Sequence, residues 1–258
     1  AGPALRLLAM RGGGLRLAVT LLTAVPLPGR PDPAAPTRRQ AGAAMAWAPL
    51  VGLAAGGVAA AVLWAGGRWA GPLLGAVLAI AALAALTGAL HLDGLADLAD
   101  GLGSRRPAAR ALDIMRQSDI GPFGVAALVF TLLIQVTALA RAESLGRGAV
   151  AVTAAAVTAR LAMTAACRPG VPAARPAGLG ALVAGSVRPA LLAGLAGAVV
   201  GGAAALGVIF AVAVVAGLAA GLAVTAIAVR RLGGITGDVL GAVAEVSAAV
   251  CLLVTALR

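Results

Sequence analysis

The stretch ALLAGLAGAVVGGAAALGVIFAVAVVAGLAAGLAVTAIAV, residues 190–229, contains no charged side chain and decides the fold class. A bilayer core needs about 20 consecutive apolar residues per helix. The stretch is too long for one crossing, so we predict two transmembrane helices with a turn near Gly207. In hydrocarbon every backbone polar group must be bonded within the chain, which favours helices over an open sheet.

Similar apolar segments occupy most of the chain. The 258 residues are 61% hydrophobic and 11% charged, with a mean hydropathy of +1.03. A soluble domain would carry about 25% charged residues. We place further spans at residues 45–63, 73–90, 122–140, 149–166 and 239–257. The sequence therefore predicts one all-α, polytopic integral membrane domain over residues 1–258, with about seven transmembrane helices.

Two local patterns refine this picture. Residues 17–25 are apolar but too few to cross a bilayer, so we expect an interfacial or re-entrant segment. The pairs Gly197/Gly201 and Gly217/Gly221 have the GxxxG spacing that is typical of closely packed membrane helices.

The basic residues are better explained by membrane topology than by nucleic-acid binding. All 20 are Arg, the net charge is +11, and most lie in short segments between spans, with almost no aromatic residues nearby. If residues 93–116 face the cytoplasm and the spans alternate, most arginines fall on the cytoplasmic side. We therefore expect a multi-pass protein of the bacterial inner membrane with its polar loops in the cytoplasm. The lipid bilayer is then a partner, and the sequence does not decide between a monomer and a homo-oligomer.

Five of the nine acidic residues are concentrated between residues 93 and 119. On a helix, Asp93, Asp97 and Asp100 stand at i, i+4 and i+7 and share one face. Three such carboxylates repel one another unless a cation lies among them, and oxygen ligands suit Mg²⁺ or Mn²⁺. The alternative is a solvated helix end with arginine counterions. We favour a metal site, because carboxylates near a bilayer are costly and are normally kept for ion or substrate work.

The same segment, residues 91–119, carries arginines and the single histidine of the chain. Arg110 and Arg116 could bind phosphate oxygens through two parallel hydrogen bonds, although positive-inside topology alone also explains arginines here. His91 is a candidate base or ligand, with a structural hydrogen bond as the alternative.

A second motif occupies residues 230–242, just before the last predicted span. Gly234 and Gly237 around Thr236 suggest close backbone approach to a ligand. Asp238 is a candidate metal ligand or base. The alternative is a glycine-rich turn with a helix cap.

Three segments in this order resemble the cobalamin synthase family, the adenosylcobinamide-GDP ribazoletransferases. They are HLDGLADLADG at 91–101, ALDIMRQSDIGPFG at 111–124 and RRLGGITGDVLGA at 230–242. TLLTAVPLP at 20–28 and ARPAGLGALV at 174–183 are looser matches. One departure is Gln117-Ser118-Asp119, where many members carry Asp-Ser-Arg, so no role is assigned to Gln117 or Asp119.

The resemblance implies a Mg²⁺-dependent transfer in cobalamin biosynthesis. A hydroxyl of α-ribazole, or of its 5′-phosphate, attacks the cobinamide-side phosphate of adenosylcobinamide-GDP and GMP leaves. Together, the residues and the resemblance suggest catalytic roles for Asp97, Asp238 and His91. We expect the metal to be held by Asp93, Asp97, Asp100 and Asp238. The expected substrate-binding residues are Arg110, Arg116, Ser118, Gly234, Thr236 and Gly237.

Two rival functions use the same aspartates. A CDP-alcohol phosphotransferase would require a DG…AR…G…D…D order, but here Gly94 is followed by Ala96-Asp97. A cation transporter would place acids within several mid-bilayer helices, whereas most lie at one interface, apart from Glu245.

Overall fold

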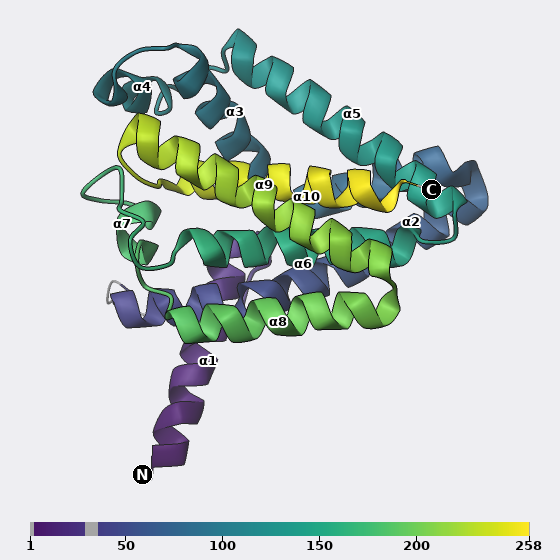
Figure 1. Ribbon diagram of the computed structural model, residues 1–258, viewed down its shortest axis with the longest axis horizontal. Helices are drawn as coiled ribbons and strands as arrows, with labels where there is room; N and C mark the ends of the chain where they lie inside the picture. Colours follow the sequence, from purple (N-terminus) through teal and green to yellow (C-terminus); the bar gives the residue numbers. More distant parts are fainter. Residues whose placement is uncertain (1–2, 29–35, 258) are drawn as a thin grey trace.

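The computed structural model describes residues 3–28 and 36–257, with side chains from Gly13 onward. Over these residues the chain is almost entirely helical (Figure 1), which confirms the all-α prediction. The helices are α1 Pro3–Leu22, α2 Arg38–Leu86, α3 Leu90–Gly103, α4 Ala108–Ile114, α5 Pro122–Ser144, α6 Gly148–Ala166, α7 Leu179–Val183, α8 Pro189–Leu206, α9 Val208–Leu232 and α10 Gly237–Thr255.

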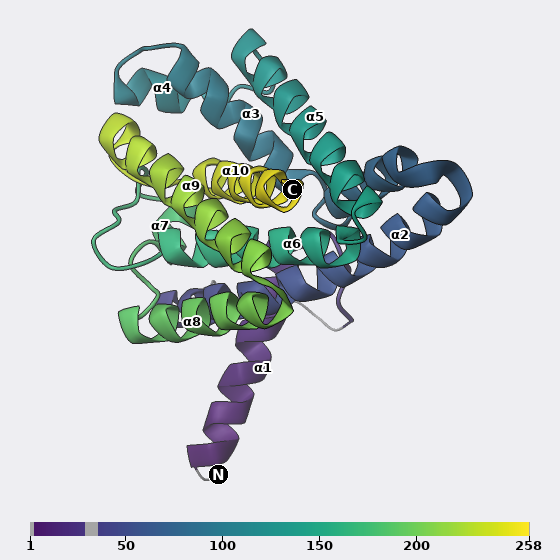
Figure 2. The same ribbon diagram turned by 45° about the vertical axis from the view of Figure 1, so that its right-hand side comes forward.

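Six of the described helices are long and apolar enough to cross a membrane: α2, α5, α6, α8, α9 and α10. Helix α2 reverses direction at Gly71, where φ is 87° and ψ is 167°, a conformation that favours glycine. The chain then folds back closely, since a Cβ on Gly75 would lie 2.7 Å from the Gly67 nitrogen. Figure 2 shows the two antiparallel arms of α2. The second arm adds a seventh apolar segment, which agrees with the prediction of about seven.

The long apolar stretch divides as predicted. Helix α8 ends and α9 begins at Gly207. Of the two GxxxG pairs, Gly217 and Gly221 contact the neighbouring helices: added Cβ atoms would lie 2.7 Å from the Ser247 carbonyl oxygen and 2.3 Å from its hydroxyl. Gly197 and Gly201 have no described atom within 4 Å of an added Cβ. Within the described residues, the close packing expected from the spacing is therefore confirmed for Gly217/Gly221 and wrong for Gly197/Gly201.

The predicted span 73–90 ends earlier than expected. Helix α2 stops at Leu86, and Thr87 donates its hydroxyl to two carbonyl oxygens of the preceding turn. Gly88 and Ala89 both take φ near 59° before α3 begins. The end of the predicted segment 17–25 lies beside this break, because the Ala24 amide donates to the Leu86 carbonyl at 2.8 Å.

Helix α6 forms the centre of the bundle and packs against α2, α9 and α10. Small residues allow this approach: a Cβ on Gly52 would lie 2.5 Å from the Ala156 carbonyl oxygen. Large apolar side chains lie on the outside instead, with Trp69 89% exposed and Phe130 66% exposed. Small residues between helices and large ones outside are the arrangement expected in lipid.

The polar loops gather at one end of the bundle, on the left in Figure 1. This end contains α4, α7, the last turns of α3, α6 and α9 and the first turns of α5, α8 and α10. The start of α2 also lies here, since Arg38 donates to the Ala184 carbonyl beside α7. The turn at Gly71 and the C-terminal end of α10 lie at the opposite end. The predicted convergence of the polar loops is therefore present, whereas a cytoplasmic orientation stays a prediction.

Candidate active site

Helices α3 and α10 cross at the polar end with almost no space between their backbones. A Cβ on Gly94 would lie 2.7 Å from the Asp238 carbonyl oxygen, and one on Gly241 would lie 3.0 Å from the His91 carbonyl oxygen. Glycine at both positions permits this contact. As a result Asp97 of α3 and Asp238 of α10, which are far apart in the sequence, share one polar region.

The carboxylates interact electrostatically. Partial burial raises the pKa of Asp97 from 3.8 to about 6, with further contributions from Asp93, Asp238 and Asp100, while Arg175 opposes the shift. Asp93 and Asp97 also lie one turn apart on the same helix, as the sequence predicted. Excess negative charge at this point therefore favours binding of a proton or a cation.

Asp238 is held in place by two neighbours. Thr236 caps α10, accepting a hydrogen bond from the Val239 amide at 3.2 Å and donating to Asp238 Oδ2 at 3.1 Å. Arg175 places one guanidinium nitrogen 3.8 Å from the same Oδ2 and donates with another to the Leu112 carbonyl at 2.6 Å. The sequence reasoning missed Arg175, whose only signal was its position in the loosely matching segment 174–183.

Asp100 has a different environment from the other acids of α3. Its two carboxylate oxygens accept backbone N–H groups of Gly121 at 2.7 Å and Gly124 at 2.9 Å, and the residue is buried. The Asp100 carboxylate therefore caps the N-terminus of α5, where backbone amides without intrahelical partners favour a negative charge. A role of Asp100 as a metal ligand stays a prediction.

The acids suit a hard cation by chemistry. Among the described residues, no three His, Cys, Asp or Glu side chains are placed to hold a metal ion by themselves. Mg²⁺ often binds through only one or two carboxylates, with water and substrate phosphates as its other ligands. Asp97 and Asp238, whose negative charges interact electrostatically, fit that pattern.

A polar cavity of about 660 Å³ lies between α3, α4 and the start of α5. Asp100 forms part of its wall, and Arg106 and Arg110 contribute cationic side chains. Its other polar lining residues are Ser104, Gln117 and Asp119. Arg116 and Ser118 are exposed in the neighbouring turn and do not line this cavity, so the structure brings only Arg110 of the predicted phosphate-binding residues to it.

His91 is separated from the aspartate carboxylates of α3. Residues two apart on a helix do not share a face, so His91 and Asp93 point in different directions. His91 is only 5% exposed and lines an interior cavity with Arg160 of α6. The placement favours the structural alternative, and a catalytic role stays a prediction.

The glycine-rich motif is explained in part by packing within the chain. A Cβ on Gly234 would lie 2.4 Å from the Pro172 carbonyl oxygen, and Ile235 exchanges backbone hydrogen bonds with the same loop. Among the described residues, only Leu179 lies within 4 Å of a Cβ added to Gly237, at 3.7 Å. Contacts of Gly234, Thr236 or Gly237 with a substrate stay predictions.

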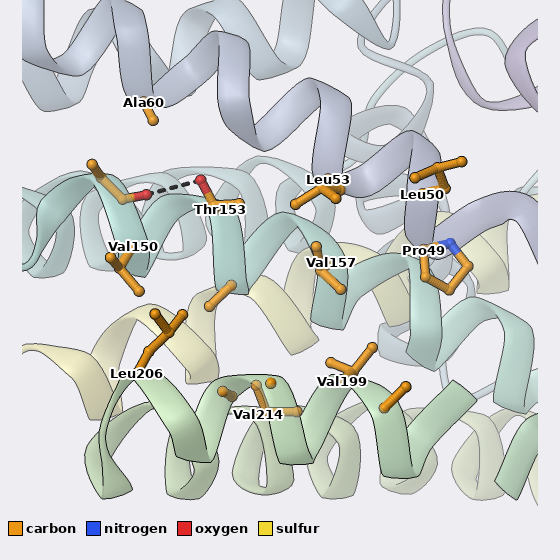
Figure 3. Close-up of a pocket in the computed structure, with 15 residues that line it drawn as sticks. Pro49, Leu50, Leu53, Ala60, Val150, Thr153, Val157, Val199, Leu206 and Val214 are labelled. Atoms are coloured by element: carbon orange, nitrogen blue, oxygen red, sulfur yellow. Dashed lines mark hydrogen bonds between the residues drawn. The ribbon is translucent and has the colours of Figure 1, made fainter. Parts of the chain in front are cut away.

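A second large hollow, of about 590 Å³, lies between α2, α6 and the α8–α9 pair (Figure 3). Its lining is apolar except for Thr153, whose hydroxyl is bonded to the Ala149 carbonyl at 2.8 Å. It contains no side chain able to transfer a proton or hold an ion. The polar end is therefore the candidate active site.

Known proteins resemble this chain over nearly its whole length. The family described as cobalamin-5-phosphate synthase matches residues 14–256. A relative from Frankia casuarinae, named adenosylcobinamide-GDP ribazoletransferase, is 46% identical over 94% of each chain. Relatives with the same name from a Nocardioides species and from Bradyrhizobium diazoefficiens are 41% and 40% identical; the matches cover 94% of this chain in both cases, and 98% and 92% of theirs. No solved structure gives a significant match. Since the matches extend over nearly the whole sequence, the chain belongs to the cobalamin-5-phosphate synthase family.

Proposed function

We propose that the chain joins adenosylcobinamide-GDP to α-ribazole, or to α-ribazole 5′-phosphate, and releases GMP. The attacking hydroxyl oxygen forms a bond to the cobinamide-side phosphorus. The bond from that phosphorus to the bridging oxygen breaks, and GMP leaves with the electron pair. The product is adenosylcobalamin or its 5′-phosphate. The names of the relatives support this reaction.

One structural observation carries the proposal: two acids from segments far apart in the sequence interact at the α3–α10 crossing, and Asp100, one turn after Asp97 on α3, lines a cavity that also contains arginines. Asp97 of α3 and Asp238 of α10 interact electrostatically. The neighbouring cavity of about 660 Å³ is within the usual range for small-molecule sites, about 300–1,000 Å³. Arg106 and Arg110 in its lining offer forked donors to diphosphate oxygens.

The residues can be given distinct tasks. Arg110 binds and orients the diphosphate, so that the attacked phosphorus lies at the α3–α10 crossing. Asp238, held by Thr236 and Arg175, either accepts the hydroxyl proton or contributes an oxygen to the metal. A bound Mg²⁺, held by Asp97 together with either Asp93 or Asp238, and otherwise by water and substrate phosphates, would supply positive charge to the phosphate oxygens.

We also propose that the polar end faces the cytoplasm of a bacterial cell. Most of the described arginines lie there, in connecting segments or in the helix turns next to them, as the positive-inside rule predicts. They are Arg38, Arg39, Arg105, Arg106, Arg110, Arg116, Arg168, Arg175, Arg188, Arg230 and Arg231. The opposite end has Arg68, Arg141 and Arg147.

The direct test is GMP release by the purified full-length protein in lipid nanodiscs. We expect GMP to form from adenosylcobinamide-GDP when α-ribazole is added, to stop forming in EDTA, and to resume when Mg²⁺ is restored. Parallel reactions with the 5′-phosphate separate the two acceptors. No GMP with either acceptor would overturn the proposed reaction, and full activity in EDTA would overturn the metal.

A further inference from the structure

Four polar side chains meet inside the helix bundle, away from the candidate active site. Arg160 of α6, Glu245 of α10, Gln135 of α5 and His91 of α3 all line one interior cavity. Gln135 donates its amide to Glu245 Oε2 at 2.8 Å. The rest of the lining is apolar apart from Thr87. One charged side chain of each sign is therefore enclosed among membrane-spanning helices.

Arg160 lacks a direct partner in this cluster. It is 5% exposed, and its Nε is buried with no hydrogen-bond partner among the described residues. Its charge interacts electrostatically with Glu245 and His91, yet no direct ion pair joins Arg160 to an acid in the described part of the chain. A buried cationic donor without a partner is unfavourable, so a group that accepts a hydrogen bond from Arg160 Nε would stabilise it.

The cavity has the size and chemistry for water. Its volume is about 30 Å³. A buried water needs about 10–15 Å³ of such space and two to four polar partners. A metal cation would be repelled by Arg160 and an anion by Glu245, whereas water can accept from one and donate to the other.

We propose that this cavity is a structural water site, in which one or two water molecules bridge Arg160 to Glu245 and His91. The bridge ties the first turn of α3 to α6 and α10. This anchor matters because α3 starts at a break in the chain and has no side-chain cap on its N-terminus. Arg160 and Glu245 are then positioning residues for Asp93 and Asp97, which follow on the same helix; this last consequence rests on the proposed function.

The water can be detected directly in the unmodified protein. X-ray pulses split bound water into hydroxyl radicals, which label the side chains in contact with it. We expect severalfold faster labelling of His91 and Leu92 than of Phe130, which is exposed on the apolar surface of α5. Labelling of His91 and Leu92 as slow as that of Phe130 would show a dry cavity and overturn the proposal.

A double-mutant cycle tests the bridge through melting temperature (Tm) in detergent. Arg160→Met and Glu245→Gln each leave one buried charge unpaired, so we expect each to lower the Tm more than the double variant does. Arg160→Lys keeps the charge and should recover part of the loss. Arg141→Met, on the exposed end of α5, is the matched control and should change nothing. Losses that simply add would overturn the coupling.

Enzymatic turnover then tests the positioning role. Loss of a residue that orients a catalytic group typically costs about 10- to 100-fold in activity. We expect Arg160→Met to lower kcat by such a factor with KM unchanged, and Arg160→Lys to restore part of it. An unchanged kcat would overturn the positioning role. Labelling and Tm do not use the reaction, so a lack of GMP release by the unmodified protein would count against the proposed function alone.

Discussion

At the scale of single residues, the environment of Asp97 explains why this position suits ion binding. Asp97 is partly buried, stands next to other carboxylates and has a pKa raised to about 6. The folded protein therefore carries an unfavourable charge at neutral pH. Functional sites commonly contain ionisable groups with perturbed pKa values, because a bound ligand can compensate the unfavourable charge.

The first prediction concerns Asp97→Asn. The folded pKa exceeds the value of 3.8 expected for an unperturbed carboxyl, so the folded state binds the proton more tightly. The contribution of Asp97 to stability is therefore most favourable below pH 3.8 and is lost as the pH rises to about 6. In metal-free buffer at pH 7.5 we expect Asp97→Asn to raise the Tm. In buffer with Mg²⁺ we expect the same variant to show no GMP release.

The difference in Tm between Asp97→Asn and the unmodified protein should shrink as the pH falls from 7.5 to 4. Asp113→Asn, an exposed change on α4, serves as the control and should alter neither property. Retained turnover in Asp97→Asn would contradict the assigned role.

The second prediction concerns Arg175, which contacts both α4 and Asp238. Arg175→Ala removes the cation that orients Asp238, and we expect kcat/KM to fall by about 10- to 100-fold, as for other residues that orient catalytic groups. Arg168→Ala is the comparison, because Arg168 bonds only to a nearby backbone carbonyl in the described structure. An equal loss in both variants would point to general damage of the loop.

At the scale of secondary-structure elements, one side chain joins two helices at the polar end. Asp100 of α3 bonds to the Gly121 and Gly124 amides at the start of α5. The wall of the polar cavity therefore depends on this contact as well as on α3 itself. Sequence spacing placed Asp100 with Asp93 and Asp97, but the neighbouring helix decides what its carboxylate bonds to.

The third prediction is that Asp100→Ala destabilises the protein and distorts the cavity. Loss of a helix cap costs about 0.5–2 kcal/mol. We expect a lower Tm together with a higher KM for adenosylcobinamide-GDP, and a smaller change in Asp100→Asn, which keeps one acceptor. Thr37→Ala removes the cap of α2 instead and should lower the Tm without raising KM. An unchanged KM in Asp100→Ala would show that substrate binding in the cavity does not depend on Asp100.

At the scale of the whole molecule, the bundle separates a polar end from an apolar body. The native thiols Cys167 and Cys251 are buried, which leaves a low background for labelling with membrane-impermeant reagents. This separation makes the orientation in the membrane testable with introduced cysteines.

The fourth prediction is the topology itself. We expect Ser104→Cys, in the polar cavity, to react only when the cytoplasmic side is accessible. Ser144→Cys, at the far end of α5, should react only from the other side. Intact cells and inverted vesicles provide the two conditions. The opposite pattern would place the candidate active site outside the cytoplasm.

The sequence by itself determined the membrane class, the turn near Gly207 and the shared helical face of Asp93 and Asp97, because hydropathy and helical period are local properties. It also indicated that the polar loops would share one end, since alternating spans leave few arrangements. Only the tertiary structure decided the break at residues 87–89, the pairing of Arg175 with Asp238 and the isolation of Arg160. These features depend on which helices become neighbours, and contacts between distant segments leave no periodic pattern in one sequence.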